Sequence, residues 1–221
     1  MIARTSRAEI RRLVGTRVPG MTEHDRDEMA IPSYLHWNPL IRWLMWRRYE
    51  AVAELAALAP GQRVLVFGCG IGLFLPTLAA RVGAAYAIDR FPAFARALVA
   101  SRGLPVTFVD SVEAVADASL DTIVAADVME HLDAPREWAA LFRRKLLPGG
   151  RLVVSGPTET PIYKLGRIAA GFAGKGDYHH TNVARLCEDI TIEGFRLERG
   201  RSLPFAVPPH LFKVLAFTRC A

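Results

Sequence analysis

The sequence contains few cysteines and no long uninterrupted run of apolar residues. Three cysteines, Cys69, Cys187 and Cys220, occur among 221 residues, and neither their spacing nor their odd number suits a zinc site or a closed set of disulfide bridges. The longest uncharged run, Val64 to Ala80, is broken by three glycines and a proline, so it does not predict a membrane span. These absences predict a protein of the reducing cytoplasm that holds no metal ion, with membrane association left open.

Lysine is also scarce, because it supplies only four of the 28 basic residues and arginine supplies the rest. This bias is typical of a genomic base composition rather than of a nucleic-acid surface, and most of the arginines are spread along the chain. We therefore expect no nucleic-acid partner. The formal net charge of +6 still favours anionic substrates or lipid headgroups.

Length and composition together predict one α/β domain with an appendage. Apolar residues make up 51% of the chain and charged residues 23%, as in ordinary soluble globular proteins. We expect residues 1–60 to form an N-terminal arm, frayed at its start, and a helical cap. We expect residues 61–221 to form the main domain.

The cap contains one strongly patterned segment, Asn38–Leu58, which has the apolar spacing of a helix with Pro39 in its first turn. Two interpretations of this helix stay open. In the first, the helix packs on the main domain and covers a ligand cleft. In the second, it lies at a membrane surface, with Trp43, Trp46 and its arginines among the lipid headgroups.

From Gly61 onward, strand-like apolar runs alternate with helical patterns, which predicts a doubly wound, seven-stranded, mostly parallel sheet. The last two strands are close enough in sequence to form an antiparallel pair. The expected strands are Arg63–Phe67, Ala85–Asp89, Val106–Val109, Thr122–Ala126, Arg151–Ser155, Phe195–Ser202 and Leu211–Thr218.

Helices are expected in the gaps between these strands. Asp133 and Thr181 are placed to cap the last two helices, and Pro148-Gly149-Gly150 predicts a hard stop before the fifth strand. The expected helices are Leu73–Val82, Ala93–Arg102, Pro135–Leu147 and Asn182–Glu193.

A glycine-rich turn follows the first expected strand. Gly68-Cys69-Gly70-Ile71-Gly72 leads from this strand into an apolar helix, an arrangement that lets a nucleotide-like ligand approach the backbone at a helix N-terminus. A dinucleotide fingerprint would place its third glycine at position 73, where this chain has Leu73. The pattern therefore disfavours NAD.

Polar residues end three further strands. Asp89 ends the second strand, at a spacing that suits a contact with two vicinal ribose hydroxyls. Asp110 and Ser111 end the third, where they can reach the amino edge of an adenine, and residues 127–132 end the fourth. Because the carboxyl ends of parallel strands meet at one rim, these groups predict a site for an adenosine-containing cofactor.

These motifs resemble those of the class I S-adenosylmethionine-dependent methyltransferases, in particular the small-molecule group related to quinone biosynthesis, also called type 11. The resemblance covers the chain from Gly61 to Pro157 well and does not cover residues 1–60, where such families place a variable substrate lid. It implies a Rossmann-like methyltransferase fold, S-adenosylmethionine as cofactor, and methyl transfer to a small-molecule acceptor. Apolar and lipid-like molecules are among the acceptors to be expected. It is carried by Gly68–Gly72, Asp89, Asp110, Leu120–Val124, Glu130–Leu132 and Leu146–Leu152.

The resemblance also implies roles for individual residues. The glycines would lie against the methionine portion and the ribose, Asp89 would hold the ribose hydroxyls, and Asp110 the adenine. Asp127 would lie beside the sulfonium. The expected cofactor-binding residues are Gly68, Cys69, Gly70, Gly72, Asp89, Arg90, Asp110, Ser111, Asp127 and Val128.

One position departs from the family pattern. The family usually has an acidic residue two positions before the first glycine, where this chain has Val66. That acidic residue helps to order the loop and the amino end of the cofactor, so its replacement predicts weaker affinity unless another carboxylate serves. The candidates in the N-terminal segment are Glu23, Asp25, Asp27 and Glu28.

A hydroxyl acceptor must lose a proton, and histidine is the side chain best tuned to take it near neutral pH. His131 follows the fourth strand, and His179 and His180 lie on the same rim, before the last helix. Each of these histidines also has a structural alternative, in bonding a loop or capping a helix. Tyr178 and Trp37 are the expected substrate contacts.

Two functions of other classes stay open. The first is a non-catalytic partner subunit with a methyltransferase fold, for which Val66 is the best support. The second is a membrane-surface protein that acts through the Trp/Arg-rich N-terminal helix. Beside the expected acceptor pocket, residues 158–175 are expected to form either a mobile flap or a small helix.

Overall fold

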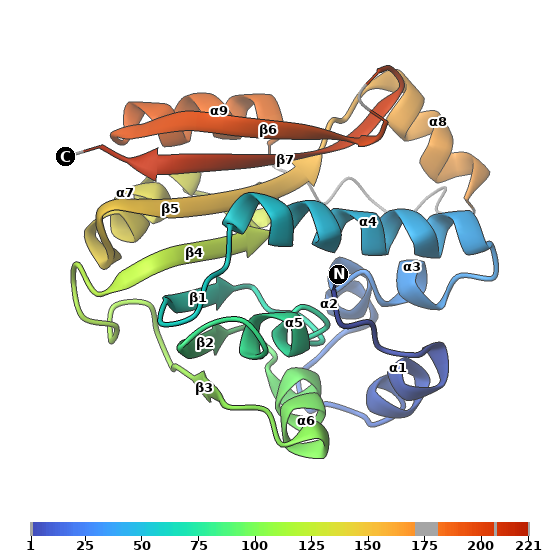
Figure 1. Cartoon of the computed structure of the whole chain (residues 1–221). Coiled ribbons are helices and arrows are strands. Elements are labelled where there is room, and N and C mark those ends of the chain that lie inside the picture. The colour runs from blue at the N-terminus through green and yellow to red at the C-terminus, as the bar shows by residue number, and fades with distance from the viewer. Residues whose placement is uncertain (1, 171–180, 206, 221) are drawn as a thin grey trace.

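The computed structural model describes residues 2–170, 181–205 and 207–220, and it shows one sheet with helices on both faces (Figure 1). The strands are β1 (Arg63–Phe67), β2 (Ala84–Ile88), β3 (Val106–Phe108), β4 (Leu120–Ala126), β5 (Leu146–Pro157), β6 (Phe195–Pro204) and β7 (His210–Arg219). Their order in the sheet is β3-β2-β1-β4-β5-β7-β6, and β7 runs antiparallel to both of its neighbours. The predicted fold class and the antiparallel last pair are confirmed.

The helices fall into an N-terminal group and a group that connects the strands. A short 3-10 helix, η1 (Met129–His131), follows β4. The α-helices are α1 (Arg7–Val14), α2 (Glu23–Glu28), α3 (Ile31–Leu35), α4 (Pro39–Ala56), α5 (Leu75–Ala79), α6 (Ala93–Arg102), α7 (Pro135–Lys145), α8 (Pro161–Ala169) and α9 (Val183–Ile192).

The core has two layers, because alternate residues of a strand point to opposite faces of the sheet. In β1, Val64 and Val66 pack in the layer that contains α4, α5 and α6. Leu65 and Phe67 pack in the layer that contains α7 and α9. Each buried side chain of this kind stabilises the fold by roughly 1.5–3 kcal/mol. A continuous apolar strand such as β1 is therefore held from both sides, which fixes the loop that follows it.

Two predicted helix caps are wrong. Asp133 does not cap α7, since the cap position is Ala134, which makes no side-chain hydrogen bond, and Pro135 begins the helix with a preset backbone angle. Thr181 does not cap α9. Asn182 does, and its side chain accepts hydrogen bonds from two backbone N–H groups of the first turn.

Two helix boundaries also differ from the prediction. Helix α7 ends at Lys145, and the extended backbone of β5 begins at Leu146, so Pro148-Gly149-Gly150 lies inside the strand and not between helix and strand. The register between β4 and β5 shifts in this region, which accommodates the irregular stretch. Helix α5 is shorter than the predicted Leu73–Val82, because the glycine-rich loop extends further before the helix begins.

The N-terminal segment is not frayed. Ser6 caps α1, and the backbone N–H of Ala3 donates to Oγ1 of Thr77 over 3.0 Å. Glu9 on α1 pairs with Arg102 on α6, with 2.6 Å between Oε2 and Nη2. These contacts tie the first helix to the main domain. The division of the chain at residue 60 stays a prediction.

Helix α4 begins as predicted, with Asn38 as its cap, and ends at Ala56, two residues before the predicted Leu58. It packs across the sheet in front of β4 and β5 (Figure 1). Trp46 is only 8% exposed, and its ring lies edge-on to that of Tyr34 at a centroid distance of 5.5 Å. The interpretation in which Trp46 lies among lipid headgroups is therefore wrong, and the packing interpretation describes most of the helix.

Candidate functional site

Two adjoining cavities open at the carboxyl ends of the parallel strands. The first, here the glycine-loop cavity, measures about 500 Å³ and is lined by the loop after β1, the ends of β2, β3 and β4, and α2. The second, here the helix cavity, measures about 230 Å³ and lies between α3, α4, α8 and β7. Five residues line both cavities: Glu28, Ala30, Arg48, Asp127 and His131.

The glycine loop closely approaches the segment between β4 and η1 and leaves its backbone open to the first cavity. Gly68 has φ +69°, and a Cβ there would lie 2.5 Å from Cγ2 of Val128, so no larger residue fits without movement. At Gly70 the space in front of the Cα holds no heavy atom within 4 Å of an added Cβ. A ligand can therefore lie directly against the backbone at Gly70.

Asp89 secures the loop from the end of β2. Its Oδ2 accepts a hydrogen bond from the backbone N–H of Gly70 over 2.6 Å, and its Oδ1 accepts one from that of Phe91 over 2.9 Å. Burial raises the pKa of Asp89, and the two hydrogen bonds oppose that effect. Each carboxylate oxygen keeps a free lone pair, so Asp89 can also accept from the hydroxyls of a ligand.

Most of the predicted cofactor residues line this cavity. Gly72 and Ser111 do not. Gly72 instead lies close to Ala95 of α6, which an added Cβ would approach to 3.0 Å, and Ser111 accepts a hydrogen bond from the backbone N–H of Ala114. The predicted residues in the cavity wall are Gly68, Cys69, Gly70, Asp89, Arg90, Asp110, Asp127 and Val128.

Among the candidate catalytic histidines, the structure places His131 at the junction of the two cavities. Its Nδ1 lies 3.7 Å from Oε1 of Glu28, and its side chain is 18% exposed. His179, His180 and Tyr178 lie outside the described residues.

Two further predictions concern the acceptor side. Trp37, expected to touch substrate, is 77% exposed and lines neither cavity. Residues 158–175 were expected to form a flap or a small helix, and residues Pro161–Ala169 of this connection do form a helix, α8. It lines the helix cavity through Tyr163, Gly166 and Arg167.

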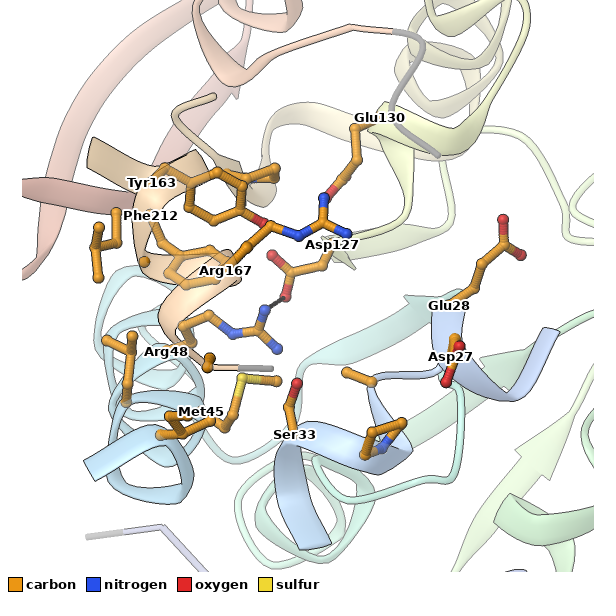
Figure 2. Close-up of a pocket in the computed structure, with 18 of the residues that line it drawn as sticks. Asp27, Glu28, Ser33, Met45, Arg48, Asp127, Glu130, Tyr163, Arg167 and Phe212 are labelled. Atoms are coloured by element: carbon orange, nitrogen blue, oxygen red, sulfur yellow. Dashed lines mark ion pairs between the residues drawn. The ribbon is translucent and has the colours of Figure 1, made fainter. Parts of the chain in front are cut away.

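Arg48 is a site residue that the sequence analysis did not select. It is 5% exposed, its Nη1 lies 2.7 Å from Oδ2 of Asp127, and its guanidinium carbon lies 4.9 Å from the ring centre of Phe212 (Figure 2). Burial alone would lower the pKa of Arg48, but the charge of Asp127 and the neighbouring tyrosines raise it overall. The sequence feature that could have identified Arg48 is its spacing from Met45 and Val52, which places this charged residue on the apolar stripe of the helix.

Glu130, in η1, lies in the wall of the helix cavity. It is 1% exposed, and its Oε2 has no hydrogen-bond partner in the described part of the chain. Burial, followed by the charge of Asp127, raises the pKa of Glu130 well above its ordinary value. The carboxyl is therefore biased toward its protonated form, which can donate a hydrogen bond.

Val66, which replaces the expected acidic residue, is buried in the core at 3% exposure. Among the candidate substitutes, Asp25 and Glu28 line the glycine-loop cavity, Asp27 lines the helix cavity, and Glu23 lines neither. The Asp25 carboxylate is already engaged, because its Oδ2 accepts from the N–H and the hydroxyl of Thr22, and these bonds lower the pKa of Asp25. Glu28 lines both cavities, and its Oε1 lies 3.2 Å from Nε2 of His24 and 3.7 Å from Nδ1 of His131.

The comparisons with known proteins agree with this geometry. A family model described as a methyltransferase domain matches residues 42–210. The chain belongs to this methyltransferase family. The resemblance to class I S-adenosylmethionine-dependent methyltransferases is confirmed, and S-adenosylmethionine, the expected cofactor, is the methyl donor of that class.

A ubiquinone biosynthesis O-methyltransferase from Xanthomonas euvesicatoria is 33% identical to this methyltransferase over 154 residues, which are 64% of each chain. The chain thus spans less than two thirds of the length of this curated relative. Two solved structures share the fold. The N-methyltransferase NodS from Bradyrhizobium japonicum, in complex with S-adenosylhomocysteine, has a TM-score of 0.65 and 18% identity, over 89% of this chain and 97% of NodS. Magnesium protoporphyrin IX methyltransferase from Synechocystis has a TM-score of 0.63 and 19% identity, over 89% and 93%.

The residues present fit the expected cofactor. The glycine-loop cavity has the volume of a small-molecule site, open backbone at Gly70 and a carboxylate at Asp89 that can accept from ribose hydroxyls. These are the features that an adenosine group needs at this edge of the sheet. The alternatives of a non-catalytic subunit and of a surface protein acting only through its N-terminal helix are not favoured by the comparisons.

Proposed function

We propose that this methyltransferase transfers a methyl group from S-adenosylmethionine to a small, largely apolar acceptor held in the helix cavity. The observation that carries the proposal is the shared wall of the two cavities, which contains Arg48, Asp127 and His131. A donor in one cavity and an acceptor in the other would meet at this wall. In this proposal residues 1–60 act as a cap, because α2, α3 and α4 close both cavities.

The cofactor, when bound, supplies a methyl group already activated on a sulfonium. The chain has to bind the cofactor and the acceptor, orient them toward each other and exclude water. Asp89 would accept from the ribose hydroxyls, Asp110 would face the adenine, and Glu28 would hold the amino end in place of the acidic residue missing at Val66. Asp127 would lie next to the reacting centre, kept there by Arg48.

The composition of the helix cavity supports an apolar acceptor with one polar end. Ile41, Leu44, Met45 and Phe212 supply the apolar part of the wall. Glu130 supplies a buried carboxyl with an unused oxygen. The relative from Xanthomonas euvesicatoria is named an O-methyltransferase. A hydroxyl acceptor must lose a proton, and His131 would serve as the base that takes it.

His131 would take the proton of that hydroxyl as the oxygen attacks the methyl group. Glu28, 3.7 Å away, would orient the imidazole and stabilise its charge. His179 and His180 remain predicted alternatives for this role, and Tyr178 remains a predicted substrate contact. Trp37 lines neither cavity and would not touch an acceptor held there.

Turnover measurements test the proposal. Methyl transfer from labelled S-adenosylmethionine to a series of apolar phenols is measured for the intact chain and for His131→Asn. Loss of a general base predicts that kcat falls by roughly 10²- to 10⁴-fold while the KM for the phenol changes little. His210→Asn is the matched control, because His210 lines neither cavity.

Two results would count against the proposal. An unchanged kcat in His131→Asn would remove His131 as the base. Binding of S-adenosylhomocysteine without turnover on any acceptor would favour the non-catalytic alternative.

We also propose that the start of α4 contacts a membrane, because Trp37, Leu40 and Trp43 are exposed there. The rest of α4 is not part of this proposal. Among the helices that the structure describes, none combines the length and the apolar character needed to cross a membrane. A cytoplasmic location stays a prediction.

A further inference from the structure

The exposed apolar side chains of this methyltransferase are concentrated on three segments, 36–48, 160–170 and 203–213. In the described part of the chain, ten large apolar residues are exposed, and eight of them lie on these segments. The other two are Ile192 and Leu197. The eight are Trp37, Leu40, Trp43, Ile162, Leu165, Ile168, Phe205 and Val207, and we call this set the apolar face.

The three segments are neighbours in space. Nε2 of His36 lies 2.9 Å from the backbone oxygen of Ala170, which joins the entry to α4 to the end of α8. The rings of Tyr163 on α8 and Phe212 on β7 are perpendicular at a centroid distance of 5.6 Å. Figure 1 shows the start of α4, α8 and the turn between β6 and β7 on the same side of the molecule. The three segments that carry the apolar face therefore lie together on one side of the molecule.

The charged side chains on the three segments are all basic, although Glu159 directly precedes the second segment. The three segments contain no aspartate or glutamate, although the chain has 22 acidic residues. They do contain basic residues, among them Lys164, which is exposed on α8, and Arg42 on α4, whereas Arg167 of α8 lines the helix cavity. A surface with protruding apolar and tryptophan side chains among basic groups complements an anionic lipid surface, because the apolar groups enter the acyl boundary and the basic groups meet the headgroups.

The inner sides of the same elements wall the helix cavity. Leu44 and Met45 of α4, Tyr163 of α8, and Leu211 and Phe212 of β7 line it. Contact between the apolar face and a bilayer would therefore place the cavity next to the hydrocarbon. An acceptor dissolved in the membrane could then enter the cavity without crossing water.

We propose that the apolar face docks this methyltransferase onto an anionic lipid bilayer, from which the acceptor enters the helix cavity. The docking step stands on the surface alone, and the entry of the acceptor rests on the proposed function. The surface differs from that of an interfacial N-terminal helix, because α8 and the β6–β7 turn contribute five of its eight residues.

Vesicle co-sedimentation of the full chain tests the docking step. The probes are vesicles of phosphatidylcholine and vesicles of equal parts phosphatidylcholine and phosphatidylglycerol. The variant Leu165→Ser/Ile168→Ser removes two apolar side chains that line neither cavity. The matched control, Ile192→Ser/Leu197→Ser, removes the two exposed apolar side chains outside the face.

The intact chain should bind the anionic vesicles more strongly than the neutral ones. The α8 variant should lose about tenfold or more in partitioning, because membrane affinity scales with the buried apolar area, and the control should stay within about twofold. Lys164→Glu should weaken binding to the anionic vesicles only. No binding by the intact chain, or equal losses in the α8 variant and the control, would overturn the proposal.

Two accompanying measurements keep the proposals apart. Sedimentation velocity without vesicles shows whether the α8 variant changes the association of this chain with itself, and such a change without vesicle binding would assign the face to a second copy and overturn the proposal. Calorimetric titration with S-adenosylhomocysteine should give the same affinity for all variants. Vesicle binding without S-adenosylhomocysteine binding would refute the proposed function and leave the docking step standing.

Discussion

Arg48 on α4 and Asp127 at the end of β4 form a buried ion pair, with 2.7 Å between Nη1 and Oδ2. The pair joins the N-terminal helix to the rim of the sheet and lies in the wall shared by both cavities. Asp127 has φ +53°, a left-handed conformation that non-glycine residues adopt rarely and that clusters at functional sites. The ion pair thus holds a strained backbone at the point where donor and acceptor would meet.

Removing one partner of this pair should destabilise the fold strongly. Arg48→Met leaves the Asp127 carboxylate, which is 17% exposed, without its cation, and the cost should approach the lower end of the range typical of a fully buried pair, about 3–5 kcal/mol. The double variant Arg48→Met/Asp127→Asn should recover part of the loss, because no unpaired charge remains. Urea denaturation of the intact chain and both variants measures the effect. A double variant no more stable than Arg48→Met would show that the two side chains do not act as a pair.

Gly68→Ala should destabilise the loop through a contact with Val128, which lies between β4 and η1. The new Cβ would lie 2.5 Å from Cγ2 of Val128, at a backbone φ of +69°. We expect a loss of about 1–3 kcal/mol from overpacking and a lower Tm. Val128→Gly in the same chain should restore part of the Tm, because it removes both the Cγ2 of Val128 and its Cβ, which would lie 2.8 Å from the new Cβ. If Val128→Gly gives no recovery, strain in the loop backbone and not the clash determines the loss.

Glu130 should make the stability of the fold depend on pH in a definite direction. Because burial raises the pKa of Glu130 in the folded chain, the folded state binds this proton more tightly than the unfolded state. The contribution of protonated Glu130 to the free energy of unfolding is therefore complete below the ordinary glutamate pKa of about 4.3. It is lost as the pH rises through the higher pKa that Glu130 has in the folded state. Glu130→Gln removes this loss. The variant should gain stability relative to the intact chain as the pH is raised from 4 to 8, and a constant difference between the two would contradict the buried protonated carboxyl.

Glu28 should substitute for the acidic residue that is absent at Val66. Glu28→Gln is expected to weaken the binding of S-adenosylhomocysteine by about tenfold, the value of a hydrogen bond to a charged group. Glu23→Gln is the matched control, since Glu23 lies on the same helix but lines neither cavity. Calorimetry measures both affinities. Equal affinities in the two variants would mean that the amino end of the cofactor is held by another group.

The strands and the glycine loop could be predicted from sequence because short apolar runs and glycine spacing are local signals. β1 and α6 were predicted to the residue, and Gly103, which follows α6, has a φ of +58° that suits the end of a helix. The caps of α7 and α9 were misplaced by one residue each. At α9 two neighbouring polar residues, Thr181 and Asn182, compete for the cap. Helix α7, by contrast, begins at Pro135 after Ala134, which has no capping side chain.

The site could be predicted on its cofactor side and not on its acceptor side. Asp89 and the glycine loop belong to one strand–turn–helix unit, so their neighbourhood follows from local order. The helix cavity brings together α4, α8 and β7, segments that are more than 100 residues apart between α4 and the other two. No local pattern joins Arg48 to Phe212 or exposes the unused oxygen of Glu130. These relations exist only after the N-terminal helices have packed on the sheet.

Calorimetric titration of the intact chain with S-adenosylhomocysteine, alongside Asp89→Ala, tests the central claim most directly. The account predicts micromolar binding to the intact chain. It also predicts a loss of about tenfold to 100-fold in Asp89→Ala, because the variant removes hydrogen bonds from ribose hydroxyls to a charged acceptor. No binding to the intact chain, or equal binding to both proteins, would contradict the assignment of the glycine-loop cavity to the methyl donor.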